Sequence, residues 1–255
     1  MRNNIFITGA EGGFGQAVAR KFGAAGYFVG LTGLDGAALD RLADELGGPE
    51  HAYAHVLDVT DVAQAQAAVE GFAAASGNGV QVLFNNAGIM PVGAFGELDI
   101  ATERKVIDIN LFGVMNVAYA ALPYLKATTG AHIINVSSAS AIHGNPELVA
   151  YSASKRAVMS FSESLDISLR GTGIAVSDIL PMYAKTSLVS NVESALRKAP
   201  SVNITAEDIA DTVWRVVRTK RFRSYVGADT KVFARLGRIA PYGIRKWLTR
   251  RVLGW

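Results

Sequence analysis

Residues 137–155 (SSASAIHGNPELVAYSASK) decide both the fold and the chemistry that this chain can carry. The apolar run before them, residues 131–136 (AHIINV), has the length and composition of a buried parallel strand. Within residues 151–169, apolar side chains recur at helical spacing. A strand that ends at Ser138 and a helix that begins near Tyr151 place both hydroxyls at the carboxyl edge of a sheet. Open α/β sheets bind their ligands at that edge.

The spacing of Tyr151 and Lys155 indicates acid/base chemistry. The two residues are four apart, so on a helix their side chains lie on one face. A tyrosine hydroxyl has an ordinary pKa of about 10 and is a poor base at neutral pH. A nearby ammonium group favours the phenolate and lowers that pKa toward the range that suits proton transfer. Ser138 can then donate a hydrogen bond to a substrate oxygen while Tyr151 exchanges the proton. A Tyr-x-x-x-Lys pair alone is more often an ordinary surface pair, so this interpretation depends on a cofactor site elsewhere.

The composition indicates a globular protein with a substantial core. Of its 255 residues, 50% are hydrophobic and 18% are charged. The absence of cysteine excludes disulfide bonds, zinc–thiolate sites and cysteine nucleophiles, and the four histidines lack metal-ligand spacing. No apolar run approaches the ~20 residues that span a bilayer, and the first predicted strand begins too early to leave room for a secretory signal. We therefore expect a cytoplasmic protein without a metal site.

A glycine-rich turn near the start of the chain predicts a dinucleotide site. Residues 4–8 (NIFIT) form a short apolar strand, residues 8–15 (TGAEGGFG) a turn, and a helical pattern follows. Glycines let the backbone approach a pyrophosphate, and free N–H groups at the helix N-terminus face its charge. Glycine clusters also serve ordinary turns, but the order strand, glycine-rich turn and helix favours cofactor binding.

Strands and helices alternate along the rest of the chain. Further strands are expected at residues 27–32, 52–57, 80–84, 131–136, 174–180 and 224–226. Helices are expected at residues 36–46, 62–75, 102–128, 151–169 and 206–219. This alternation is typical of a parallel sheet covered by helices on both faces. We predict an α/β fold: a single doubly wound domain with a mostly seven-stranded parallel sheet.

The successive motifs resemble those of the short-chain dehydrogenase/reductases, in the compact branch of that family. The matching motifs are Thr8-Gly9-x-x-x-Gly13-x-Gly15, Asp58, Asn85-Asn86-Ala87-Gly88, Asn110, Ser138 and Tyr151-x-x-x-Lys155. They occur in the family's order from the first strand to about Thr186, which is far more specific than any one motif. The resemblance implies a Rossmann-type domain and an NAD(P)-dependent oxidoreductase that moves a hydride between the nicotinamide and a secondary alcohol or ketone.

The resemblance also implies a role for each matched residue. Tyr151 would be the acid/base, and Ser138 would orient the substrate oxygen. Lys155 would hold the nicotinamide ribose and lower the tyrosine pKa, and Asn110 would hold a water that continues the proton path. Residues that bind the pyrophosphate, adenosine and nicotinamide would be Gly9, Gly12, Gly13, Phe14, Gly15, Asp58, Val59, Asn86, Ala87, Gly88, Tyr151, Lys155, Pro181 and Thr186.

The substrate residues are expected around the nicotinamide: Ser140, His143, Met182 and Tyr183. Met182 follows Pro181 where the family usually has glycine, so its flexible side chain would either contact an apolar substrate or pack in the core. An apolar surrounding favours a hydrophobic alcohol or ketone over a sugar or a small polyol.

The end of the second strand bears on the choice between NAD and NADP. An acid there would accept hydrogen bonds from the ribose 2′-OH, and an arginine nearby would pair with a 2′-phosphate. This chain has Gly33 and Leu34 at those positions, and Asp35 stands two residues late, where a helix N-cap is its ordinary role. Glu11 lies in the glycine loop, where NADP-using members often carry a basic residue, and its carboxylate would repel a 2′-phosphate. We expect NAD to be preferred over NADP.

The charge of the chain is divided between an acidic body and a basic end. Residues 1–214 contain 13 Lys/Arg and 21 Asp/Glu, whereas residues 215–255 contain 12 Lys/Arg and one Asp. The pI of about 9.1 therefore belongs to the end of the chain and does not indicate nucleic-acid binding.

We divide the chain into a catalytic domain at residues 1–230, with a lid at about residues 187–203, and a tail at residues 231–255. In the tail an apolar arc that includes Ile244 and Trp247 lies opposite basic residues, as in helices that lie on anionic membranes. The alternative is that the arc packs on a neighbouring subunit, since members of the family commonly form homodimers or homotetramers.

Two other functions remain open at the level of sequence. One is a dinucleotide sensor or scaffold on the same fold. The complete set of Asn110, Ser138, Tyr151 and Lys155 argues against it, because a sensor needs no acid/base. The other is a dehydratase or isomerase that uses the same tyrosine and lysine, for which no residue argues.

Overall fold

The computed structural model describes residues 2–77, 79–181, 204–227 and 241–253. Within these ranges seven parallel strands form one sheet in the order β3-β2-β1-β4-β5-β6-β7. The strands are β1 (Asn4–Thr8), β2 (Phe28–Gly33), β3 (Ala52–Val56), β4 (Val82–Asn85), β5 (His132–Val136), β6 (Ala175–Pro181) and β7 (Arg223–Val226). The predicted doubly wound α/β fold is confirmed.

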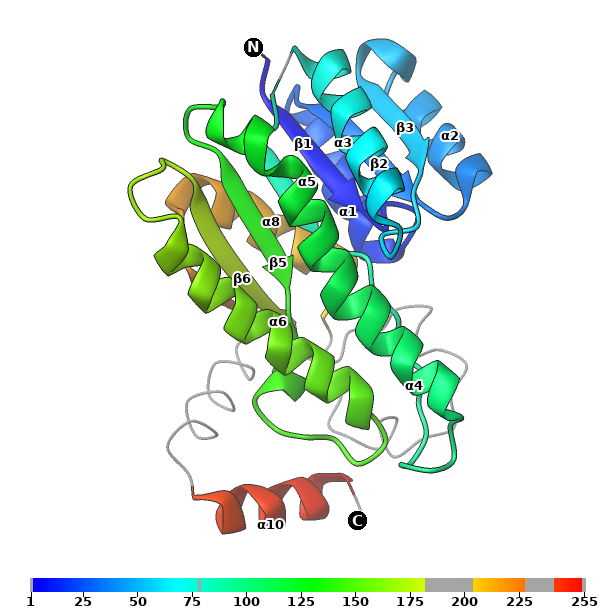
Figure 1. The fold of residues 1–255 in the computed structure, drawn as a ribbon, viewed down its shortest axis with the longest axis vertical. Coiled ribbons are helices and arrows are strands. Elements are labelled where there is room, and N and C mark those ends of the chain that lie inside the picture. Colours follow the sequence, from blue (N-terminus) through cyan, green and yellow to red (C-terminus); the bar gives the residue numbers. More distant parts are fainter. Residues whose placement is uncertain (1, 78, 182–203, 228–240, 254–255) are drawn as a thin grey trace.

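Helices cover both faces of the sheet (Figure 1). They are α1 (Gly13–Ala24), α2 (Gly36–Glu45), α3 (Val62–Ser76), α4 (Ile100–Ile107), α5 (Val114–Lys126), α6 (Val149–Ser168), α8 (Ala206–Thr219) and α10 (Tyr242–Leu253). Helices α1 and α8 pack together against one face, and α3 and α5 pack together against the other.

The inner strand β1 shows why the sheet is buried on both sides. Ile5 and Ile7 belong to the core cluster with α1 and α8, whereas Phe6 points into the cluster with α3 and α5. Successive side chains of a strand point to opposite faces, so a strand covered on both faces must be apolar throughout. Phe6 meets Phe72 of α3 edge to face, with ring centroids 5.2 Å apart. A Cβ at Gly30 of β2 would lie 2.6 Å from the Phe72 ring, so the glycine makes room for that ring.

The long helix predicted over residues 102–128 is divided in the structure. A π-helical turn, Asp108–Gly113, separates α4 from α5 and contains Asn110. Such turns are frequent at functional sites. By length and composition alone, Ile100–Lys126 could cross a membrane. The inner face of α5 nevertheless belongs to the core of the domain, through Val117, Ala118, Ala121 and Leu125.

The strand order reverses direction between β1 and β4, and ligands of doubly wound folds bind at this point. Four hydrogen bonds join the two loops that leave these strands. The Nδ2 of Asn86 donates to the carbonyl oxygens of Thr8 and Gly9, each at 3.0 Å. The Oγ1 of Thr8 accepts from the backbone N–H groups of Asn86 and Ala87, each at 3.0 Å. The glycine loop is thereby fixed against the segment that follows β4.

The predicted lid at residues 187–203 and the first part of the predicted tail, residues 231–240, lie outside the described residues. The helical interpretation of the tail agrees with α10, where Tyr242, Ile244 and Trp247 are exposed. The domain boundary at residue 230 and the surface that the tail covers stay predictions.

Candidate active site

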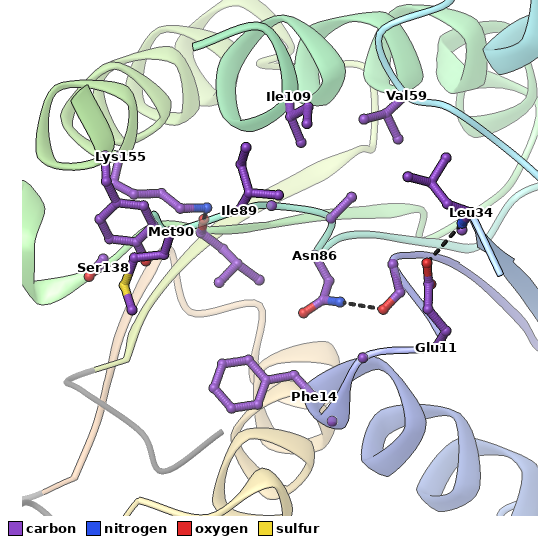
Figure 2. Close-up of a pocket in the computed structure, with 18 of the residues that line it drawn as sticks. Glu11, Phe14, Leu34, Val59, Asn86, Ile89, Met90, Ile109, Ser138 and Lys155 are labelled. Atoms are coloured by element: carbon purple, nitrogen blue, oxygen red, sulfur yellow. Dashed lines mark hydrogen bonds between the residues drawn. The ribbon is translucent and has the colours of Figure 1, made fainter. Parts of the chain in front are cut away.

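A cavity of about 480 Å³ lies at the carboxyl edge of the sheet (Figure 2). Its walls come from the glycine loop, from the loops that follow β2, β3, β4 and β5, and from α6. Ser138, Lys155 and Met90 lie at one end in Figure 2, and Glu11 and Leu34 lie at the other. The two ends of the cavity therefore differ in chemistry, with a lysine and a serine at one and a glutamate at the other.

The glycine loop has the properties of a phosphate site. Helix α1 begins at Gly13 after an N-cap, Gly12, that provides no side-chain cap, and the first turn has no acid. The first N–H groups of a helix have no partner within it, so they are available to an anion. A Cβ at Gly15 would lie 2.4 Å from the carbonyl oxygen of Gly9. Gly9 itself has a φ of +64°, and a Cβ there would lie 2.9 Å from the Cα of Ala87. These close approaches fit a pyrophosphate-binding turn.

Lys155 of α6 is a buried cation at the opposite end of the cavity. Its Nζ donates to the carbonyl oxygen of Val136 at 2.9 Å. Among the described residues, the other two N–H bonds of the ammonium find no acceptor, so they suit ligand hydroxyls such as those of a ribose. Burial lowers the pKa of Lys155 to about 8, although the Asp178 carboxylate acts in the opposite direction. The Nζ lies 5.8 Å from the centroid of the Tyr151 ring, close enough to favour the phenolate.

Ser138 follows β5 and caps a 3₁₀ turn, Ala139–Ala141. Its Oγ accepts a hydrogen bond from the backbone N–H of Ser140 at 3.2 Å, which leaves its own O–H to donate to a ligand. Tyr151 lies on the first turn of α6 and lines the same cavity. The structure thus brings together the serine, tyrosine and lysine that the sequence selects.

Asn110 is completely buried beneath the cavity and acts as a brace in the structure. Its Oδ1 accepts from the backbone N–H of Ile89 at 2.8 Å, and its Nδ2 donates to the carbonyl oxygen of Ile89 at 3.0 Å. The same Nδ2 reaches the hydroxyl of Ser154 on α6 at 3.2 Å. A Cβ at Gly88 would lie 3.0 Å from the Asn110 Oδ1 and 3.5 Å from the Lys155 Nζ. Asn110 therefore fixes the loop after β4 against α6.

An ionic network that is buried at Asp178 and exposed at Glu163 lies beside Ser137. Asp178 of β6 accepts a hydrogen bond from the hydroxyl of Ser137 and pairs with Arg223, whose Nε lies 3.0 Å from its Oδ2. Arg223 in turn pairs with Glu163 on α6 at 2.9 Å. Burial raises the pKa of Asp178 to about 6, because the hydrogen bond from Ser137 and the charge of Arg223 offset only part of the desolvation. The network ties the end of β5 to β6 and α6.

The family model for the short chain dehydrogenases matches residues 3–197. The chain belongs to the short-chain dehydrogenase/reductase family. A sulfoacetaldehyde reductase of Chromohalobacter salexigens is 36% identical to it over 229 residues, which are 85% of this chain and 88% of the relative. The 1-deoxy-11-beta-hydroxypentalenate dehydrogenase of Streptomyces exfoliatus is 32% identical over 230 residues, or 89% of this chain and 83% of the relative.

Solved structures of other short-chain dehydrogenase/reductases have the same fold. A member from Burkholderia phymatum in complex with NAD superimposes with a TM-score of 0.82 at 28% identity, covering 92% of each chain. A member from Streptomyces avermitilis has a TM-score of 0.84 at 28% identity, covering 98% of this chain and 96% of its own. This short-chain dehydrogenase/reductase is therefore an oxidoreductase of the NAD(P)-dependent class.

Most residues that the sequence selects in this short-chain dehydrogenase/reductase line the cavity: Gly9, Gly12, Gly13, Phe14, Asp58, Val59, Asn86, Ala87, Gly88, Ser138, Tyr151, Lys155 and Pro181. Gly15 and Asn110 support the lining from behind. Ser140 is buried and His143 is half-buried, and neither is part of the lining that the structure describes. Three further predictions lie outside the described residues: Met182, Tyr183 and Thr186.

Motif matching does not select several apolar residues of the lining: Leu57, Ile89, Ile109 and Val136. Leu57 directly precedes the matched Asp58, Ile89 directly follows the matched Gly88, and Val136 lies two residues before Ser138, so closeness to a motif is the signal that could identify them. Ile109 reaches the cavity from the π-helical turn, for which the sequence gives no sign.

Proposed function

We propose that this protein interconverts a secondary alcohol and a ketone, with Tyr151 as the acid/base. The buried Lys155 ammonium, 5.8 Å from the Tyr151 ring in the cavity that Ser138 also lines, carries the proposal. When bound, the nicotinamide supplies or accepts the hydride at the carbinol carbon, so that alcohol and NAD(P)⁺ give ketone, NAD(P)H and a proton.

The chain's own residues bind and orient the substrate and move the proton. Ser138 donates a hydrogen bond to the substrate oxygen and holds it beside Tyr151. In the oxidative direction the Tyr151 phenolate accepts the hydroxyl proton, and in the reductive direction the phenol donates a proton to the carbonyl oxygen. The Lys155 cation stabilises the phenolate and lowers the tyrosine pKa. Because burial holds the pKa of Lys155 at about 8, this support is lost as the pH rises through that value.

The substrate class that fits best is hydrophobic. Ile89, Met90 and Val136 give apolar walls to the cavity that Ser138 and Tyr151 line. The names of the curated relatives point to unlike substrates, a sulfoacetaldehyde in one and a hydroxypentalenate in the other. The proposal of an apolar alcohol or ketone therefore rests on the apolar lining of the cavity and not on the substrates that the relatives' names give.

The expected cofactor is NAD, because neither Gly33 nor Leu34 at the end of β2 offers a cation to a 2′-phosphate, and Glu11 adds a negative charge there. A cytoplasmic location, a homodimer or homotetramer, and a membrane or subunit contact for the tail at residues 231–255 remain proposals.

The test compares wild type with Tyr151→Phe. Binding of NADH and NADPH is measured by calorimetry, and turnover is followed by the absorbance of the reduced nicotinamide on a panel of apolar ketones and alcohols. Tyr151→Phe should bind the cofactor within about threefold of wild type and lose about 10²- to 10⁴-fold in turnover. Tyr119→Phe, at an exposed tyrosine of α5, is the matched control and should change neither value. Unchanged turnover in Tyr151→Phe would exclude the acid/base role, and cofactor binding with no turnover on any substrate would favour a sensor.

A further inference from the structure

Glu11 reaches from the glycine loop across to the end of β2. Its Oε1 accepts a hydrogen bond from the backbone N–H of Leu34 at 2.8 Å, a contact visible in Figure 2. Its Oε2 is enclosed and finds no hydrogen-bond partner among the residues that the structure describes. An enclosed carboxylate oxygen without a donor is unfavourable, and such a group in a native protein calls for a specific reason, of which a bound ligand is one.

Gly33 is the residue that lets the Glu11 carboxylate lie there. A Cβ at position 33 would stand 1.8 Å from the Oε2 and 2.3 Å from the carboxyl carbon of Glu11. Gly33 is not among the glycines with positive φ, so its backbone does not require a glycine. A side chain at position 33 would therefore have to displace the Glu11 carboxylate, and glycine leaves the space that the carboxylate occupies. In this pair Glu11 of the glycine loop provides the carboxylate, and Gly33 at the end of β2 leaves the space that the carboxylate fills.

The carboxylate of this pair lies at the place where dinucleotide-binding folds recognise the adenosine ribose, the end of the second strand. We propose that Glu11 is the residue that distinguishes NAD from NADP in this protein: its carboxylate accepts a hydrogen bond from the ribose 2′-OH and repels a 2′-phosphate. The terminal torsion of a glutamate is broad, so the carboxylate can turn one oxygen to the cavity while the other stays on Leu34. This role rests on the proposed function, since it requires that a nicotinamide dinucleotide binds in the cavity.

Asp35 is the acid next along the chain that could bind the ribose 2′-OH, but its side chain already caps a helix. It is the N-cap of α2, where its Oδ1 accepts from the backbone N–H of Ala38 at 3.0 Å, and it is not part of the cavity lining. A cation for a 2′-phosphate is also missing: Lys155 is the one base in the lining that the structure describes, and it lies at the far end.

The experiment measures dissociation constants by calorimetry for NADH, NADPH and 2′-deoxy-NADH, which lacks the adenosine 2′-OH. A hydrogen bond to a charged acceptor is worth roughly ten- to a hundredfold in affinity, so wild type should bind NADH at least about tenfold more tightly than 2′-deoxy-NADH. NADPH should bind more weakly still. Glu11→Gln keeps the shape and an acceptor for Leu34 but removes the charge. Because the amide forms at best a neutral hydrogen bond with the 2′-OH, this variant should lower the preference for NADH over 2′-deoxy-NADH at least about threefold and the preference for NADH over NADPH at least about tenfold.

A second variant tests the pair without touching Glu11. Gly33→Ala places a methyl group where the carboxylate lies, so it should reduce the NADH preference as Glu11→Gln does, and the double variant should show no further loss. Asp35→Asn is the control, because asparagine is an equally good N-cap and the preference should stay as in wild type. Thermal unfolding measures whether each variant is folded. If Gly33→Ala does not fold, the binding ratios of Glu11→Gln alone test the role of Glu11.

The outcomes separate the role of Glu11 from the proposed function. If wild type binds neither NADH nor NADPH, the proposed function fails and the role of Glu11 fails with it. If wild type binds either cofactor but Glu11→Gln leaves both ratios unchanged, the proposed function stands and the role of Glu11 is refuted.

Discussion

Lys155 should make the folded protein less stable than it would be with an apolar side chain in its place. Burial lowers its pKa from 10.5 to about 8. A pKa difference of that size means that burying the charged lysine lowers the free energy of unfolding by about 3 kcal/mol at neutral pH. In Lys155→Met an unbranched side chain fills the same space. The loss of the hydrogen bond to Val136 reduces the gain in stability by about 1 kcal/mol. We expect Lys155→Met to raise the free energy of unfolding by about 1–2 kcal/mol at pH 7.

The pH dependence separates the charge of Lys155 from its packing. Because the folded-state pKa lies below the unfolded-state value, the unfolded chain binds more protons between about pH 8 and pH 10.5, and wild-type stability rises with pH across that window. Lys155→Met lacks this rise, so its advantage should be largest at pH 7 and shrink toward pH 10. Urea unfolding at pH 7, 8, 9 and 10 measures the difference, with Lys126→Met as the control at an exposed lysine. A less stable Lys155→Met at pH 7, or a difference independent of pH, would refute the reasoning.

The same substitution should lower turnover while it stabilises the fold. If Tyr151 acts as the proposed acid/base, loss of the cation removes the support for its phenolate, and turnover should fall about 10²-fold or more. A buried charge that weakens the fold and serves the chemistry is a common form of the conflict between stability and activity.

Two further substitutions test the glycine loop and the buried acid. Gly15→Ala would bring a Cβ within 2.4 Å of the backbone at Gly9, so it should lose about 1–3 kcal/mol of stability and bind NADH weakly. Gly13→Ala, whose Cβ would meet no described atom within 4 Å, should keep its stability; equal urea midpoints for the two variants would contradict the packing argument. The folded-state pKa of Asp178, about 6, lies above the ordinary 3.8, so the folded chain binds the extra proton and stability should fall by about 3 kcal/mol as the pH rises from about 4 to 6. Asp178→Asn should lack this decline in urea unfolding, and an unchanged slope would show that Asp178 is not its source.

The sequence was sufficient to predict the layers of the fold and the end of the cavity that Ser138 and Tyr151 line. Apolar runs such as residues 4–8 identify central strands, because such strands are buried on both faces. The carboxyl ends of parallel strands meet at one edge, so Ser138 and Tyr151 could be placed together from their positions after β5 and at the start of α6. These features depend on periodicity and order, which a sequence displays directly.

Features that depend on the direction of one side chain could not be predicted in the same way. The π-helical turn at Asp108–Gly113 has no signature in composition, so the brace between Asn110 and Ile89 was not foreseen. An acid in β6 could be read from the sequence, but its partner Arg223 lies 45 residues away and is selected only by the pairing of β6 with β7.

The contact between Glu11 and Gly33 also limits how this sequence can evolve. An acid introduced at position 33 would have to displace the Glu11 carboxylate, so we expect that mutation to be unfavourable while Glu11 is present. Loss of Glu11 alone leaves the end of β2 without any carboxylate at the cavity. On the proposed role of Glu11, we expect each single change to weaken cofactor binding and the two together to preserve it, so the two positions should be epistatic. A lineage that carries this pair is expected to keep it or to change both positions at once.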